Sequence, residues 1–491
     1  MPFLGGRRIA SQHGEAYADW LTQVYKGTGD TDYVGYFFHR AAELLSPTGC
    51  VGFIATAAIT DGDNRRTVLA RLMQADTPFE IYGATTGVPW QGNAQVRVST
   101  VHLGRGLPPA SLDVKVLDDR RVRAINSRLR SGEDWPDPLP LTENEGGALV
   151  GCFLRGDGFV LDEEDGLAFL RKHPEEANVV RPFLVGDDLN NSPEQRAQRY
   201  VIDFRDMTLD EARRFPHALA IVERDVRPKR ERLKTTGADA DHRKHWWRFA
   251  NTRRELRERA ATMPRFLAAA RVSKHTMFAF VPSSWTPSEQ VVIFPLPTGT
   301  AFAVLQSRIH RVWVTLQASH MGEGIRYSAT DCFTPFPFPA RAPIATLPKL
   351  EALGEELHAS RAAVMAERQE GLTQTYNALH DPECQAAGIV GLRRLHEAID
   401  RSVLDAYGWR DVRVPAYCSW EAGSSEYQVF EDTVAARLFA LNVERSAARV
   451  DAERNASPGP GGRAAGRAGP GPHKVTTTTS DAPKRLRGRK V

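Results

Sequence analysis

The sequence predicts an α/β fold in three parts: half of a doubly wound domain, a mixed α/β block and a helical C-terminal segment. Three observations support this prediction. Residues 15–104 alternate between amphipathic helices and short apolar strands, which is the pattern of a doubly wound sheet. Residues 151–340 mix short strands with helices, and residues 345–450 keep helical spacing throughout. The length of 491 residues fits about three domains of ~150 residues each.

The first part contains the elements of one half-domain. The apolar run at residues 49–59 predicts a strand that is buried on both faces of a mostly parallel sheet. No first βαβ unit precedes these elements, so the pattern predicts only the second half of the domain. The other expected elements are helices at residues 14–25, 32–45 and 64–74 and strands at residues 79–83 and 94–104.

Residues 107–150 are rich in Pro, Asp and Arg and predict a connector with a few strands. Next, residues 146–162 alternate around a Gly-Asp-Gly turn and predict a β-hairpin. Thr208 is expected to cap a helix that has Asp210 and Glu211 in its first turn. Residues 302–318 predict a single helix, and its apolar stripe contains Leu305, Ile309, Val312 and Trp313.

The net charge of +4 hides an uneven distribution. Residues 224–274 contain 16 Lys/Arg and 6 Asp/Glu, a net charge of +10. Cations interleaved with aromatic residues predict a surface that neutralises phosphates and stacks on sugars or bases. A solvated helix is the alternative for residues 253–259, where Arg and Glu are spaced for ion pairs (Arg254 with Glu258, Glu255 with Arg259). The interleaved aromatic residues are Trp246, Trp247, Phe249 and Phe266.

Other features limit the possible functions. No apolar run approaches the ~20 residues of a membrane span. Five scattered cysteines predict reduced thiols in a cytoplasmic protein. Residues 451–491 have low complexity, with nine Lys/Arg and three acidic residues, and predict a disordered basic tail.

No metal site is expected. Four carboxylates in two acidic turns fit turn and capping roles better than metal ligation, because no His or further carboxylate stands at ligand spacing. Two histidines near the expected helix at residues 302–318 fit packed or exposed structural roles. These six residues are Asp187, Asp188, Asp203, Asp206, His310 and His320.

Several sequence blocks carry a resemblance to a known family. The opening MPFLGG resembles the end of the (Asn/Asp)-Pro-Pro-(Phe/Tyr) motif of adenine amino-methyltransferases. The blocks DYVGYFFHRAAELLSPTG, VGFIATAAITDGDNRR and GATTGVPWQGNAQVRVSTVHLG resemble later motifs of the large single-chain restriction–modification methyltransferases (MmeI-like, type IIL). The blocks RFLAAARVSKH, LQSRIHRVW and IRYSATDCFTPFPFP resemble their target-recognition domain, and LTQTYNALHDPE and LHEAIDRSVLDAYGW resemble their helical C-terminal domain.

The resemblance implies a domain order and a reaction. The implied function is transfer of a methyl group from S-adenosylmethionine to the N6 amine of adenine in a double-stranded DNA site, within a restriction–modification or phage-defence system. Pro2 and Phe3 are implied to be catalytic, with Phe3 stacking on the flipped-out base. The implied parts are the C-terminal half of a Rossmann-like methyltransferase domain (1–106), a connector (107–150), a DNA target-recognition domain (151–340), a helical domain (345–450) and the tail (451–491).

The cofactor-binding residues stay unknown, because the chain has no FxGxG or GxGxxG loop. We therefore expect an N-terminally truncated enzyme, with a methyltransferase or nuclease portion missing upstream. The alternative is a catalytically inactive DNA-binding fragment. No membrane partner and no metal are expected. The candidate DNA-binding residues are Arg248, Arg253, Arg254, Arg265, Arg271, Lys274, Arg308, Arg311 and Arg326.

Overall fold

The computed structural model describes residues 3–456, except residues 77, 93–95, 107–114, 133, 322–323, 341–344 and 419–423. Pro2, one of the two expected catalytic residues, lies outside the described residues, as does the expected tail from residue 457 onward. Within the described ranges, no helix is long and apolar enough to cross a membrane. The five cysteines are free thiols.

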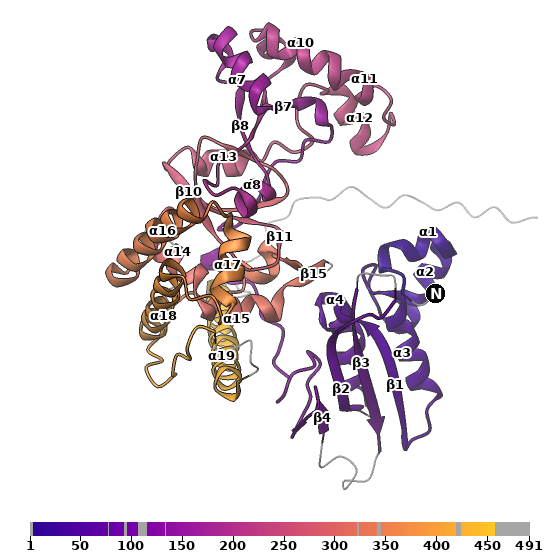
Figure 1. Ribbon diagram of the computed structural model, residues 1–491. Helices are drawn as coiled ribbons and strands as arrows, with labels where there is room; N and C mark the ends of the chain where they lie inside the picture. Colours follow the sequence, from indigo (N-terminus) through magenta and orange to yellow (C-terminus); the bar gives the residue numbers. More distant parts are fainter. Residues whose placement is uncertain are drawn as a thin grey trace, which may run out of the picture. The chain divides into compact units, whose positions relative to one another are not determined.

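The first part is a five-stranded sheet in the order β1-β3-β2-β4-β5, with α3 beside it (Figure 1). The predicted helix at residues 64–74 is present as a π-helical turn (Arg65–Ala70) between two short α-helical pieces. The helices are α1 (Ile9–His13), α2 (Glu15–Tyr25), α3 (Tyr33–Leu44), α4 (Gly62–Asn64) and α5 (Arg71–Met73). The strands are β1 (Gly49–Thr56), β2 (Glu80–Pro89), β3 (Arg97–Arg105), β4 (Lys115–Leu117) and β5 (Arg120–Val122).

The expectation of a mostly parallel sheet is wrong for these strands. β1 pairs antiparallel with β3, from Gly49 opposite Arg105 to Thr56 opposite Val98. β2 also pairs antiparallel with β3, and β4 pairs antiparallel with β5. The pairing of β2 with β4 is parallel. β3 follows β2 and returns between β2 and β1, which fixes the antiparallel direction. Burial of β1 on both faces is wrong too, since its residues alternate and Ile54 is exposed.

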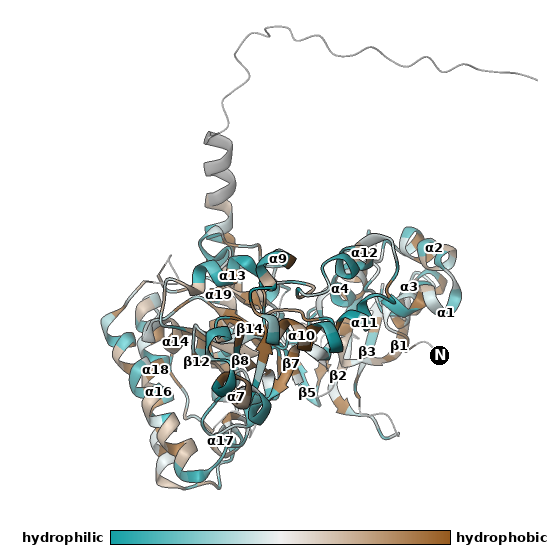
Figure 2. Cartoon of the chain, turned by 90° about the horizontal axis from the view of Figure 1, so that it is seen from above, coloured by the Kyte–Doolittle hydropathy of each residue, from teal (hydrophilic) through white to brown (hydrophobic). Residues whose placement is uncertain are grey.

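The second part contains three sheets, in the orders β12-β10-β14-β6, β13-β8-β9-β7 and β11-β16-β15. Its strands are β6 (Leu149–Val150), β7 (Val160–Asp162), β8 (Val180–Leu184), β9 (Arg199–Ile202), β10 (Arg265–Ala270), β11 (Val272–Ser273), β12 (Ala279–Pro282), β13 (Thr286–Pro287), β14 (Val291–Phe294), β15 (Ser319–Met321) and β16 (Gly324–Arg326). Its helices are α7 (Glu163–Lys172), α8 (Gly186–Asn191), α9 (Leu209–Ala212), α10 (Pro216–Asp225), α11 (Arg227–Arg230), α12 (Gly237–Lys244), α13 (Arg254–Ala260), α14 (Gly299–Gln306) and α15 (Arg308–Gln317). α11 and α12 are largely hydrophilic (Figure 2).

The predicted hairpin at residues 146–162 is wrong, because its two strands join different sheets. β6 pairs with β14, whereas β7 pairs with β9. Between them the backbone of Gly151 passes close to the segment before β14, and a Cβ on Gly151 would clash with the carbonyl oxygen of Ser288. This close approach carries the chain from one sheet to the next instead of back along β6.

The single helix predicted at residues 302–318 is broken at Ser307. Ser307 has an extended backbone (ψ 156°), and its hydroxyl accepts a hydrogen bond from the backbone N–H of His310. It therefore caps α15, as serine commonly does at a helix N-terminus. The residues of the predicted apolar stripe are buried on both sides of the break.

The C-terminal part confirms the predicted helical pattern, with α16 (Pro348–Arg368), α17 (Leu372–His380), α18 (Ala387–Tyr407) and α19 (Ser425–Ala456). α19 extends into the segment expected to be tail. These helices share one hydrophobic core with β10, β12, β14, α14 and α15, whereas residues between Cys152 and Phe249 form a separate, smaller core. A buried ion pair between Arg308 Nε and Asp400 (2.6 Å) joins α15 to α18.

Candidate nucleic-acid interface

The aromatic residues of the basic segment do not lie at the surface. Trp246, Trp247 and Phe249 are buried in the smaller core, and Phe266 is buried in the larger one. The prediction that these rings stack on sugars or bases is therefore wrong. Burial of a large apolar ring in a core lowers the free energy of the fold more than exposure on a charged surface does. The basic segment therefore exposes its cations to solvent and buries its rings.

Many of those cations are already paired with carboxylates. Arg254 Nε lies 2.7 Å from Glu258, and Arg259 pairs with Glu255 (3.2 Å). The solvated-helix alternative therefore describes α13. Arg265 is also engaged, because it pairs with Glu355 and lies over the ring of Phe280. Arg254 and Arg265 are thus less suited to DNA contact than predicted.

Two further candidates serve the interior of the fold. Arg308 is 2% exposed and holds Asp400 together with the carbonyl oxygens of Pro415 and Ala416. Arg311 is half-buried, and burial lowers the pKa of its guanidinium. The prediction that Arg308 binds DNA is wrong for this reason. A cation bound this way braces helices and is not available to nucleic acid.

Three other candidates form a group of cations, which we call the arginine cluster: Arg253, Arg271 and Arg326. Burial lowers the pKa of Arg271, and the nearby charges of Arg326 and Arg253 lower it further, whereas Glu289 acts in the opposite direction. Among the described residues, none of the three forms an ion pair with a carboxylate. Glu289 acts electrostatically on Arg271, and Asp30 interacts with Arg326, but neither carboxylate forms an ion pair with these arginines. A group of three unpaired cations is suited to bind an external polyanion.

The fold assembles the arginine cluster from distant segments. Arg271 lies between β10 and β11, and its backbone is held by Gln290 and Tyr327. Pairing of β11 with β16 places Arg326 opposite Val272. Arg253 adopts a left-handed backbone (φ 48°) before α13, and its Nε donates to the carbonyl oxygen of Gly151 (3.1 Å).

The remaining candidates, Lys274 and Arg248, have neutral hydrogen-bond partners. Lys274 is exposed, and its Nζ donates to Asn377 Oδ1 (2.8 Å). Arg248 donates to the carbonyl oxygen of Met207 (2.8 Å) and lies over the ring of Trp247. A neutral partner leaves the positive charge uncompensated, so both side chains can still attract phosphates.

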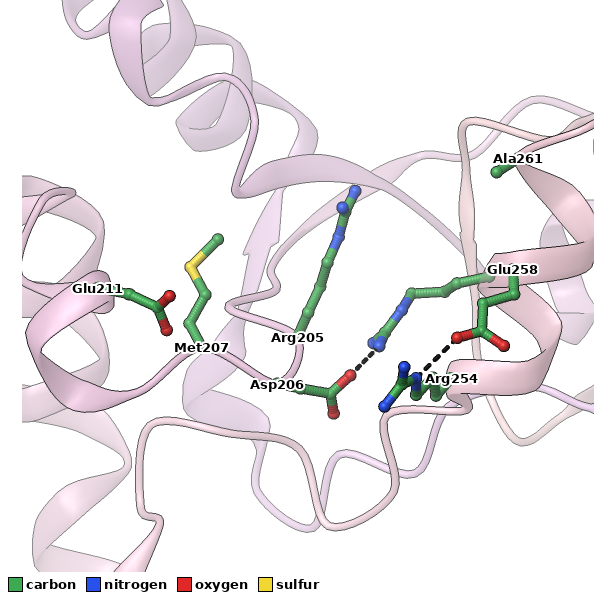
Figure 3. Close-up of a pocket in the computed structure, with 8 residues that line it drawn as sticks. Arg205, Asp206, Met207, Glu211, Arg254, Glu258 and Ala261 are labelled. Atoms are coloured by element: carbon green, nitrogen blue, oxygen red, sulfur yellow. Dashed lines mark hydrogen bonds and ion pairs between the residues drawn. The ribbon is translucent and has the colours of Figure 1, made fainter.

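The sequence did not single out Arg205, which lines a pocket of about 430 Å³ between α13 and the turn before α9. Dashed lines in Figure 3 join Arg254 to Glu258 and Asp206 to a neighbouring cation, whereas Arg205 extends from the loop without such a line. Its Nε is buried and has no hydrogen-bond partner among the described residues. Its left-handed φ of 53° gave no recognisable sequence signal.

Phe153 is a second residue that the sequence did not reveal. It is 44% exposed, and its backbone exchanges two hydrogen bonds with Asn251, two residues before Arg253. Phe153 therefore presents an exposed aromatic ring on a segment whose backbone pairs with Asn251. In the sequence it stood inside the predicted hairpin and carried no distinguishing pattern.

The remaining predicted roles are mostly structural. His310 is buried and contacts the hydroxyl of Tyr327 (3.1 Å), while exposed His320 pairs with Asp61. Asp188 accepts from the backbone N–H of Val185 at the start of α8, and Asp203 from that of Arg205. Burial raises the pKa of Asp203 to about 6. These contacts confirm the turn and capping interpretation for Asp188 and Asp203.

Phe3, the other expected catalytic residue, is 50% exposed. The loop that carries it is anchored, since Tyr33 N–H donates to the carbonyl oxygen of Leu4 (2.8 Å) and Gly6 N–H to Asp32 Oδ1 (3.3 Å). The structure therefore holds an exposed ring on a fixed loop. That arrangement is compatible with stacking on a planar ligand.

Comparison with known proteins gives the class of the domain that bears the arginine cluster. Residues 151–340 match the family model described as "MmeI, target recognition domain". The resemblance of the chain to the MmeI-like class is thereby confirmed.

Two individual proteins are similar over most of the chain. "DNA methyltransferase A" of Bacillus subtilis (strain 168) is 23% identical over 433 residues, which cover 83% of this chain and 44% of the relative. The fold is similar to that of the type IIL restriction–modification enzyme MmeI, solved in complex with DNA, with a TM-score of 0.65 and 19% identity over 91% of this chain and 56% of that chain. The chain thus spans about half the length of both proteins.

Proposed function

We propose that this chain recognises a specific double-stranded DNA sequence for an adenine-specific DNA methyltransferase of a restriction–modification or phage-defence system. The single observation that carries the proposal is the arginine cluster, which lies in the segment that matches a target recognition domain. Phosphate contacts supply most of the affinity for DNA and contacts to base edges supply the specificity. Phosphate contacts and contacts to base edges both need cations that are not already paired with carboxylates of the fold.

Within this proposal the arginine cluster makes the central DNA contact. Arg271 is half-buried and its backbone is held by hydrogen bonds on both sides, so we assign it to a base edge, where its guanidinium donates to guanine O6 and N7. Exposed Arg326 and Lys274 are assigned to phosphates, together with Arg248 and Arg253. Arg205 adds a further phosphate contact at its pocket.

Catalysis in this proposal is transfer of a methyl group to the N6 amine of adenine, with S-adenosylmethionine as the methyl donor. Phe3 would stack on the adenine after it is flipped out of the duplex, which the exposure of its ring and the anchored loop permit. Pro2 would precede it in the same motif. The proposal places this chemistry in the cytoplasm, where free thiols such as those of this chain stay reduced.

The described residues do not fit a binding loop for S-adenosylmethionine. A Cβ on Gly6 would lie 2.6 Å from the carbonyl carbon of Asp30 and the oxygen of Thr31. A glycine at this position therefore allows its segment to pack closely against Asp30 and Thr31. After β1 a single glycine, Gly62, opens the next helix, whereas nucleotide-type cofactor loops have several. We therefore assign no described residue to the cofactor.

The proposal is tested by repeated selection of duplexes from a random library with the full chain, followed by sequencing. A common short site that contains adenine is expected, and no enrichment over the input library would refute specific recognition. The selected duplex is then incubated with S-adenosylmethionine, and its nucleosides are analysed by mass spectrometry. Formation of N6-methyladenine would support the catalytic part of the proposal. Specific binding without methylation would support only the recognition part and would refute catalysis by this chain.

A further inference from the structure

Three potential metal ligands meet at the surface of the second part, and none of them is assigned to DNA. His173 follows the last residue of α7, Glu175 lies in the turn Pro174–Glu176, and His217 is the second residue of α10. Each offers one ligand atom, and these atoms lie within 4.8 Å of one another. The two imidazole rings stack with centroids 3.6 Å apart and planes at 21°, so binding of a common ion requires one ring to turn out of the stack.

The buried carboxylate of Glu176 orients the ring of His217. Glu176 accepts hydrogen bonds from the backbone N–H groups of His217 (3.1 Å) and Ala218 (2.8 Å). It also lies 2.8 Å from Nδ1 of the His217 ring. Since Glu176 is almost fully buried and acts as an acceptor, Nδ1 carries the proton and Nε2 keeps its lone pair. A carboxylate on the far nitrogen is the usual support of a metal-binding histidine.

We propose that His173, Glu175 and His217 bind a divalent transition-metal ion of the Zn²⁺ class, with Glu176 positioning His217. Two imidazoles and one carboxylate form a donor set typical of zinc sites with an open position. Mg²⁺ and Ca²⁺ are disfavoured because they require mostly oxygen ligands. Tetrahedral zinc with bonds of about 2.0–2.1 Å brings its ligands to roughly 3.4 Å from each other. Glu175 and His217 are half-exposed or more, so side-chain rotation closes this gap.

The ion would connect the turn after α7 to the first turn of α10. The proposal does not depend on the proposed function, because none of these residues is assigned to DNA or catalysis. Its expected effect is therefore on metal uptake and on the stability of the smaller core, through preferential binding to the folded state.

The test uses the full chain, stripped of metal with a chelator and titrated with Co²⁺ as a spectroscopic probe and with Zn²⁺. We expect one equivalent of Co²⁺ to produce a visible d–d absorption band that Zn²⁺ removes, and Zn²⁺ to raise the melting temperature. Both effects should be lost in His217→Ala and in Glu175→Gln, and Glu176→Gln should weaken binding about 10- to 100-fold. His245→Ala is the matched control, since His245 pairs with Asp241 outside the site.

Two results would overturn the proposal: the same Co²⁺ band in Glu175→Gln and His217→Ala as in the unchanged chain, or no uptake by the unchanged chain. An equal rise in melting temperature with Mg²⁺ would overturn the assignment to a transition metal. Glu175 is exposed, so its variant keeps the fold and gives a valid result even if His217→Ala is destabilised. Circular dichroism of each metal-free variant checks that the fold is retained.

Discussion

Replacing Arg271 with Gln removes one cation from the arginine cluster and keeps a long polar side chain. No ion pair of the described fold depends on Arg271, so stability should change little. If Arg271 reads a guanine edge, affinity for the cognate duplex should fall by about 1–3 kcal/mol, roughly 5- to 150-fold, with relaxed specificity at one position. If it contacts a phosphate, all sequences should weaken alike, and the slope of log K against log salt should become shallower by about 0.9.

Fluorescence anisotropy with a labelled duplex, at several salt concentrations, measures both quantities. Arg224→Gln is the matched control, because it removes the same charge from the same basic segment while Arg224 is already paired with Asp225 (2.7 Å). The variant that lacks all three arginines of the cluster should lose about 2.7 in slope if each contacts a phosphate. The reasoning is refuted if Arg271→Gln binds like the unchanged chain, or if Arg224→Gln weakens binding as much as Arg271→Gln does.

Three further predictions concern the fold that carries the interface. Asp400→Ala leaves the Arg308 guanidinium buried without its counter-ion, so urea unfolding should show a loss of about 3–5 kcal/mol; a loss below about 1 kcal/mol would contradict the buried pair. Thr208→Ala removes a capping box with Glu211 and should cost about 0.5–2 kcal/mol in the same assay, whereas Thr208→Ser should cost less. Burial lowers the pKa of His310 and of His396 to about 3. The unfolded chain, with histidine pKa values of about 6.5, therefore binds more protons than the folded chain between these two pH values. The free energy of unfolding should therefore fall as the pH drops below about 6.5, by up to about 1.4 kcal/mol per pH unit for each histidine, and a flat profile from pH 7 to about 4 would contradict their burial.

Features that depend on a few neighbouring residues were predictable from the sequence. The amphipathic helices α2 and α3, the capping box at Thr208 and the ion pairs along α13 are all present. Each is set by interactions over three or four residues, so the local sequence contains the information. The resemblance to the MmeI-like class was likewise readable, because it rests on motifs in order along the chain.

Strand pairing and burial were not predictable from local patterns. The apolar run at β1 was assigned to a parallel sheet, yet its direction is fixed by β3, which lies about fifty residues later. The hairpin at residues 146–162 failed because β6 found a partner in β14. A local alternation of side chains indicates a strand but carries no information about which strand it pairs with.

The same division applies to the candidate interface. The sequence by itself determined that residues 224–274 are strongly basic and that the chain resembles the MmeI-like class. Only the tertiary structure decided which cations face outward, since Arg308 is neutralised by Asp400, ninety-two residues away, whereas Arg253, Arg271 and Arg326 meet through the pairing of β11 with β16 and the contact of Arg253 with Gly151. The physical reason is that a charge is neutralised or left uncompensated by whatever lies next to it in space, and those neighbours come from distant parts of the chain.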